Sequence, residues 1–117
     1  MDLVVRVEDL DGWAVARVQG DVDLTTAPRL REQVIQVVVD GQPRVVLDLE
    51  GVDFIDSTGL GVLVGLLKRT RSQGGDLRLV STRPSLRKVL ELTALDQALP
   101  LAPDVDAAIG GANPSGG

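Results

Sequence analysis

Hydrophobic positions change their spacing several times along the chain, and each change marks an expected element. Val-rich segments at 3–8 and 13–19 lie on either side of Asp11-Gly12, a dipeptide that tolerates the positive φ angles of a tight hairpin turn. This pattern predicts an antiparallel pair of strands at the start of the chain.

A helix is predicted to begin at Thr25-Thr26-Ala27-Pro28, because Thr can cap a helix and Pro is tolerated in its first turn. Residues 44–49 then hold a short apolar run suited to a strand buried on both faces, and a loop is expected after it. The helix that precedes this strand carries apolar residues at helical spacing and ends at Gly41-Gln42-Pro43. Its apolar positions are Ala27, Leu30, Val34, Val37 and Val38.

A second helix carries Leu60, Leu63, Val64 and Leu67 at helical spacing and ends at Gly74-Gly75. Gly61 and Gly65 lie on its side, where we expect them to permit close packing against a neighbouring element. A strand at 77–80 and a third helix opening at Thr82-Arg83-Pro84 come next. A short strand at 98–101 and a helical turn at 105–109 complete the pattern.

The resulting order is β-β-α-β-α-β-α-β-α, which predicts an α/β fold built on a small mixed β-sheet. We expect a single domain over residues 1–109. Residues 110–117 are rich in Gly, Pro, Ser and Asn and show no periodicity, so they are expected to form a disordered tail.

Composition narrows the available chemistry. The 117 residues include no His and no Cys, and the formal net charge is −5. Without Cys there is no thiolate nucleophile or zinc–sulfur site, and without His there is no imidazole base or common metal ligand. We therefore expect no cofactor or metal site. The acidic balance argues against direct nucleic-acid contact, which needs a basic face.

Neither a membrane span nor an export signal is visible in the sequence. The first residues lack the basic start and long apolar core of a secretory signal. The longest apolar stretch, at 60–67, is far shorter than a membrane span. A cytoplasmic protein without membrane contact is therefore expected.

The most informative segment is Asp53-Phe54-Ile55-Asp56-Ser57-Thr58-Gly59-Leu60-Gly61, and several interpretations compete for it. Ser57 or Asp56 can simply cap the following helix. Gly59-x-Gly61-x-x-x-Gly65 is one residue longer than a dinucleotide fingerprint, and no acidic ribose-binding residue follows the next strand. An aspartic protease is disfavoured because Thr58 precedes Gly59 and a helix follows. A serine hydrolase at Ser57 would lack a His base and the G-x-S-x-G elbow.

A further interpretation treats Ser57 as a substrate. A hydroxyl at an exposed helix start needs no internal base when a kinase supplies one. The phosphate would carry a charge of about −1.5 to −2 and would face the free N–H groups and the positive dipole end of the helix. Such a change of surface charge would make a protein-binding switch.

These residues also resemble the signature of STAS-domain anti-sigma-factor antagonists of bacteria. The resemblance rests on 51–61, on Gly20-Asp21-Val22-Asp23-Leu24-Thr25-Thr26-Ala27-Pro28 and on 74–80, which agree in order and spacing. It spans about 3–109. The resemblance implies the STAS fold, in which helices lie mainly on one side of a small mixed sheet.

The resemblance implies a regulatory cycle and no enzyme activity. In that family the unphosphorylated protein binds an anti-sigma factor, usually also a serine kinase, and so frees a sigma factor. The kinase uses ATP and Mg²⁺ to phosphorylate the serine that matches Ser57, and the complex then dissociates. A metal-dependent phosphatase of the PP2C type restores the active form.

The resemblance also implies a partner-binding surface made of the loop at 21–26, the helix start at Ser57 and the exposed side of that helix. The residues expected on it are Asp21, Asp23, Thr25, Thr26, Asp56, Ser57, Thr58, Gly59, Leu60 and Gly61. Asp21, Asp23, Asp53 and Asp56 are expected to gather negative charge around Ser57. Two other classes stay open: an accessory domain of a membrane transporter or stress-sensing complex, and a small hydrolase acting through Ser57.

Overall fold

A five-stranded mixed sheet forms the centre of the computed structural model, which describes residues 2–111. Its strands lie side by side in sequence order: β1 (Val4–Leu10), β2 (Trp13–Val22), β3 (Arg44–Ile55), β4 (Asp76–Val80) and β5 (Leu101–Ala102). The pair β1–β2 is antiparallel, and the other neighbours are parallel. The predicted α/β fold on a small mixed sheet is confirmed.

The predicted hairpin is present at the start of the chain. Asp11 and Gly12 join β1 to β2 with φ angles of 51° and 82°, the left-handed region that a two-residue turn between twisted strands requires. Because β1 pairs only with β2, it forms one edge of the sheet among the described strands.

The strand β3 is longer than predicted. We expected it to end at residue 49 and a loop to follow, but it continues to Ile55. The expectation was wrong because β2 continues beside it, with Gly20 opposite Val52 and Val22 opposite Ile55, across two shifts of register. Pairing with a neighbour therefore overrides the polar, Gly-containing composition of residues 50–53, and it carries the chain directly to Asp56.

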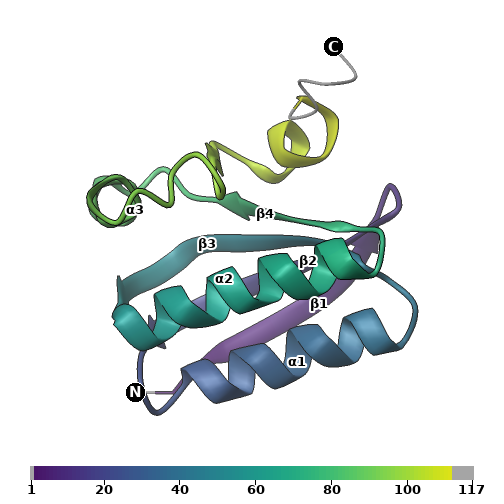
Figure 1. Ribbon diagram of the computed structural model, residues 1–117, viewed down its shortest axis with the longest axis horizontal. Coiled ribbons are helices and arrows are strands. Elements are labelled where there is room, and N and C mark those ends of the chain that lie inside the picture. Colours follow the sequence, from purple (N-terminus) through teal and green to yellow (C-terminus); the bar gives the residue numbers. More distant parts are fainter. Residues whose placement is uncertain (1, 112–117) are drawn as a thin grey trace.

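Two helices lie next to each other along one face of the sheet, α1 (Ala27–Val39) and α2 (Ser57–Ser72) (Figure 1). With Leu86 and Leu90 of α3 (Pro84–Leu92), they enclose the main core of buried Val, Leu and Ala side chains. The buried side of α2 is formed by Leu60, Leu63, Leu66, Leu67 and Thr70. None of the helices in residues 2–111 is both long and apolar enough to cross a bilayer.

The expected close packing at Gly61 and Gly65 is wrong. Both residues are exposed, and a Cβ atom built on either would meet nothing within 4 Å. The physical reason is helical spacing: Gly65 is two residues beyond the buried Leu63, about half a turn around the helix. These glycines therefore lie on the solvent side of α2.

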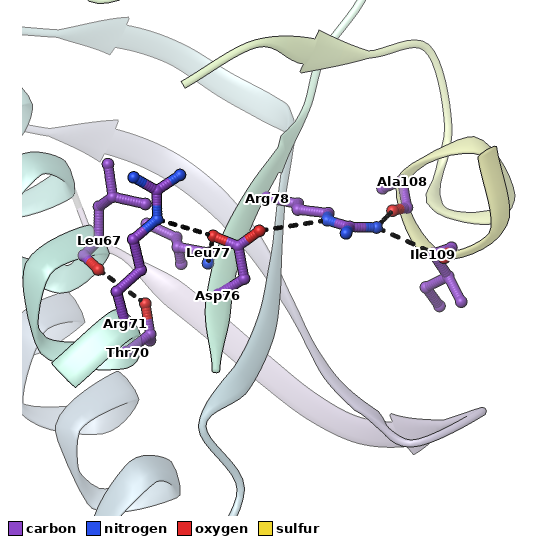
Figure 2. Close-up of polar contacts among 8 residues, drawn as sticks. All are labelled: Leu67, Thr70, Arg71, Asp76, Leu77, Arg78, Ala108 and Ile109. Carbon is purple, nitrogen blue, oxygen red and sulfur yellow. Dashed lines mark hydrogen bonds and ion pairs between the residues drawn. The ribbon is translucent and has the colours of Figure 1, made fainter. Parts of the chain in front are cut away.

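A short π-helix, η1 (Ala107–Gly111), packs Ala108 and Ile109 on the opposite face of the sheet against Trp13, Val15, Val46 and Val80. The Arg78 side chain joins it to the sheet: its Nη1 donates to the carbonyl oxygen of Ala108 at 2.6 Å (Figure 2). The Arg78 guanidinium also lies 4.5 Å from the centroid of the Trp13 ring. Asp76 lies between Arg78 and Arg71 and forms ion pairs with both.

The end of the chain differs in detail from the prediction. The last strand, β5, begins at Leu101, so the strand predicted at 98–101 was placed about three residues too early. The predicted helical turn is present but continues to Gly111, which is two residues into the segment expected to be disordered. The rest of that predicted tail, 112–117, lies outside the described residues.

Candidate functional site

Ser57 lies at the first position of α2, separated from the end of β3 by Asp56 alone, and its side chain is exposed. The helix cap is supplied by Asp56, whose Oδ1 accepts a hydrogen bond of 2.9 Å from the N–H of Gly59. Of the two capping candidates in the sequence, the structure therefore selects Asp56. Within residues 2–111 the Ser57 hydroxyl makes no hydrogen bond, so it stays available to another molecule.

Asp56 also connects the start of α2 to the loop that precedes α1. Its Oδ2 accepts a hydrogen bond of 3.2 Å from the N–H of Leu24, and its own N–H donates to the carbonyl oxygen of Val22 at 3.1 Å. One carboxylate thus joins two segments that are about thirty residues apart in sequence. The two parts of the surface expected from the sequence are brought together here.

The loop before α1 is folded around Asp23. Oδ1 of Asp23 accepts hydrogen bonds from the Thr25 hydroxyl at 2.8 Å, from the Thr25 N–H at 2.9 Å and from the Thr26 N–H at 3.1 Å. The Thr26 hydroxyl is not a side-chain cap of α1; it donates to the carbonyl oxygen of Asp21 at 2.7 Å. This network of short local bonds defines the shape of the loop.

The same hydrogen bonds keep Asp23 ionised. The bond from the Thr25 hydroxyl, followed by those from the N–H groups of Thr26 and Thr25, lowers the pKa of the Asp23 carboxyl below its ordinary value, since each bond favours the charged form. At neutral pH the loop therefore presents a fixed negative charge.

Gly59 sets the distance between α2 and the sheet. A Cβ atom at this position would lie 2.7 Å from Cγ1 of Ile55 and 2.8 Å from both Cγ1 and the carbonyl oxygen of Val22. Glycine is needed here because the helix start packs directly on the ends of β2 and β3. Gly59 therefore serves packing within the protein, which leaves little support for a glycine cradle around a nucleotide phosphate.

The expected partner-binding residues fall into two groups by exposure. Thr26, Gly59 and Leu60 are buried and support the surface from below. The side chains or backbone that reach solvent, wholly or in part, belong to Asp21, Asp23, Thr25, Asp56, Ser57, Thr58 and Gly61.

Leu24 is an apolar residue of this surface that the sequence did not single out, and Phe54 is a second exposed apolar residue, near the end of β3. Leu24, whose N–H bonds to Asp56, is 71% exposed, and Phe54 is 54% exposed at the end of β3. Phe54 is opposite Asp21 in the sheet. The exposed Leu24 side chain gives the polar loop beside Asp56 an apolar area that another protein could contact. The sequence held one signal for Leu24: it is an apolar residue inside an otherwise polar loop, where the apolar–polar alternation of a strand does not account for it.

The predicted gathering of four acidic groups around Ser57 needs a correction at Asp53. Its carboxylate pairs with the Arg83 guanidinium at 2.8 Å, and Nε of Arg83 donates to the carbonyl oxygen of Glu50 at 2.7 Å. The Asp53 charge is therefore offset by a cation from the start of α3. Asp56 adjoins Ser57, and the Asp23 loop is joined to it through Leu24.

The chemistry of this surface is that of an exposed alcohol at a helix N-terminus. A phosphoryl group placed on Ser57 would lie at the positive end of the α2 dipole, while Asp56 beside it adds a like charge. The groups that hydrogen-bond around Ser57 are carboxylates, hydroxyls and backbone amides. This set supplies no strong base for activating the serine as a nucleophile.

A family profile, a curated relative and a solved structure all match this chain over most of its length. A family profile described as "STAS domain" matches residues 4–108. The chain is 30% identical to the anti-sigma-B factor antagonist of Bacillus subtilis, with 87% of this chain and 93% of that protein covered. It is 36% identical to an anti-sigma factor antagonist from Mycobacterium paratuberculosis whose crystal structure superimposes with a TM-score of 0.83, covering 92% of this chain and 91% of the other.

A more distant structure shows the same fold. SpoIIAA of Bacillus in its phosphorylated form is 22% identical and superimposes with a TM-score of 0.69, covering 89% of this chain and 96% of that one.

Proposed function

This chain belongs to the STAS domain family, and we propose that it is a protein-binding switch in which Ser57 is the phosphorylation site. The relatives that match almost its whole length are anti-sigma factor antagonists, and this chain acts as one, as a regulatory protein and not as an enzyme. In the proposed cycle the unphosphorylated chain binds an anti-sigma factor and so frees a sigma factor. Phosphorylation of Ser57 by that anti-sigma factor, acting as a serine kinase with ATP, ends the binding.

The observation that carries the proposal is the free hydroxyl of Ser57. Asp56 satisfies the helix start, so Ser57 is exposed without a structural task in the described part of the chain. A kinase can therefore reach the hydroxyl without unfolding the helix, and the added phosphate does not need to break an existing hydrogen bond. The backbone stays in place while the surface charge changes.

The effect on binding follows from what surrounds the serine. Leu24, joined to the Asp56 cap, offers apolar area that a partner would remove from water together with Ser57. A phosphate at Ser57 would have to be desolvated at the same time, and it would be repelled by acidic groups of the same surface. A hundredfold loss of affinity corresponds to about 2.8 kcal/mol, which is well within the cost of such a change.

Reversal of the switch needs a second enzyme, and we propose a phosphatase of the metal-dependent PP2C type. It would act on the same exposed phosphoserine at the start of α2. Since the proposed kinase uses ATP, the cycle would run in the cytoplasm.

Phosphate mapping tests the site directly. The protein is incubated with its cognate anti-sigma factor kinase and ATP, and the modified residue is located by mass spectrometry. We expect the label on Ser57 and none in Ser57→Ala. Ser85→Ala is the matched control, because Ser85 is an exposed serine near the start of another helix, α3. A label that persists in Ser57→Ala contradicts the proposal.

Binding measurements test the consequence. We expect the affinity of fully phosphorylated protein for the anti-sigma factor to fall by about a hundredfold, whereas Ser57→Ala keeps most of it. Ser57→Asp is expected to give a smaller loss, because a carboxylate carries less charge than a phosphate. Unchanged affinity of the phosphorylated protein would refute the switch.

A further inference from the structure

The exposed edge of the sheet has the features of a second interaction surface. β1 is seven residues long, contains no Pro, and pairs with β2 in a continuous register without a bulge. A short length, a Pro or a bulge normally protects an edge strand from pairing with another chain, and β1 has none of these three; its charged residues are Arg6, Glu8 and Asp9. Val4 and Val7 on it are 43% and 46% exposed.

The hairpin determines which backbone groups face outward. In a two-residue hairpin the residues that close the turn, here Leu10 and Trp13, bond to each other through their backbones, and bonded and non-bonded pairs then alternate along the strand. Counting back along β1, the backbone N–H and C=O groups of Val5, Val7 and Asp9 point away from β2. They form a regular row of unpaired donors and acceptors along this edge.

We propose that two copies of this chain associate through β1, antiparallel about a two-fold axis at Val7, to form one continuous sheet. In this register each outward-facing residue meets another one, so both strands bond fully along their length. The pairs across the axis are Val7 with Val7, Val5 with Asp9, Arg6 with Glu8, and Val4 with Leu10.

Charge selects this register over its neighbours. Arg6 of each copy lies directly opposite Glu8 of the other copy, and opposite charges at such positions stabilise strand pairing. Sliding one copy by two residues is the smallest slip that keeps donors and acceptors matched. That slip places Arg6 opposite Arg6 or Glu8 opposite Glu8, which is repulsive.

The ion pairs within one chain leave Arg6 free for this role. Arg6 lies opposite Arg17 in the hairpin, and Arg17 is engaged with Glu8 and Asp48 at 2.9 Å each. Within residues 2–111, Arg6 itself forms no ion pair. A second copy would supply Glu8, whose carboxylate already pairs with Arg17 of its own chain, so Arg6 would join that ion pair from across the axis. The pairing of Val4 with Leu10 would cover two of the exposed apolar side chains.

A single strand pair is a small interface, so the dimer is expected to be weak and to depend on concentration. Sedimentation equilibrium of the full chain from about 10 µM to about 1 mM should show reversible dimerisation. Arg6→Glu alone and Glu8→Arg alone should each weaken it by about tenfold or more, because each change makes both charge pairs of the dimer repulsive. Arg87→Glu, an equal charge change on the exposed side of α3, should leave it unaltered.

Mixing the two variants separates an interface from a folding defect. Arg6→Glu mixed with Glu8→Arg restores both opposite-charge pairs across the axis, so the mixture should dimerise while each variant alone does not. In hydrogen exchange, the outward Val7 amide should gain protection with concentration, whereas the Arg6 amide, bonded to β2, should be protected throughout. A chain that stays monomeric up to about 1 mM, or a mixture that fails to associate, overturns the proposal.

Discussion

Replacement of Gly59 by Ala tests whether the packing of α2 on the sheet limits the position of Ser57. The new methyl carbon would lie within 3 Å of two side-chain atoms and of the carbonyl oxygen of Val22. A backbone carbonyl in a paired strand cannot move aside cheaply, so the helix start itself must shift.

The size of the effect follows from two opposing terms. Overpacking in a well-filled region costs about 1–3 kcal/mol, and contacts with backbone place Gly59→Ala in the upper part of that range. Alanine is preferred over glycine in a helix by up to about 1 kcal/mol, which offsets part of the cost. The net expectation is a loss of about 1–2 kcal/mol in the free energy of unfolding.

Gly61→Ala is the matched control because it makes the same chemical change two residues further along the same helix. Its Cβ atom meets nothing within 4 Å, so only the helix preference remains, and it should stabilise the protein by about 0.5–1 kcal/mol. The two substitutions should therefore move stability in opposite directions.

Urea unfolding followed by circular dichroism measures both effects. With a slope of about 1–3 kcal/mol per molar urea, the midpoints of the two variants should differ by about 1 M or more, at similar slopes. If Gly59→Ala is as stable as Gly61→Ala, the contact with Val22 does not constrain the helix start, and our account of the site geometry fails.

Three further predictions concern the loop, the cap and the second face of the sheet. Asp56→Ala removes the helix cap and the acceptor for the Leu24 N–H, and should lower the free energy of unfolding by about 1–2 kcal/mol in urea titrations. Folding lowers the pKa of Asp23, so the ionised carboxylate stabilises the protein above its ordinary pKa, and this stabilisation is lost as the pH falls below about 4. The difference in urea midpoint between wild type and Asp23→Asn should therefore shrink as the pH is lowered below about 4. Arg78→Met should loosen η1, and acrylamide quenching of Trp13, the single tryptophan, should increase while the far-UV spectrum is retained.

The parts of the fold that depend on local chemistry were predictable from the sequence. Asp11-Gly12 supplies a hairpin turn wherever it occurs between alternating strands, and the structure has it with both φ angles positive. The leucine spacing around Leu63 likewise gave the existence of α2. The existence of such elements follows from short-range preferences alone.

Features that depend on a distant neighbour were not predictable. The continuation of β3 to Ile55 arises from pairing with β2, and the residue types at 50–53 do not predict a strand. The ion pair between Asp53 and Arg83 joins residues thirty positions apart, so the acidic surface was expected to hold one more free charge than it does. The sequence placed Ser57 and Asp56 correctly in one segment but could not tell which of them would cap the helix.

The link through Arg78 has a consequence for how this protein opens. The main core holds α1, α2 and α3 on one face, whereas the other face is closed by η1, a single short helix on a small apolar cluster. Cooperative units with few buried contacts open at lower free energy than the global transition. We therefore expect η1 to detach at a lower free energy than global unfolding requires, which would expose Trp13 while the surface around Ser57 stays folded.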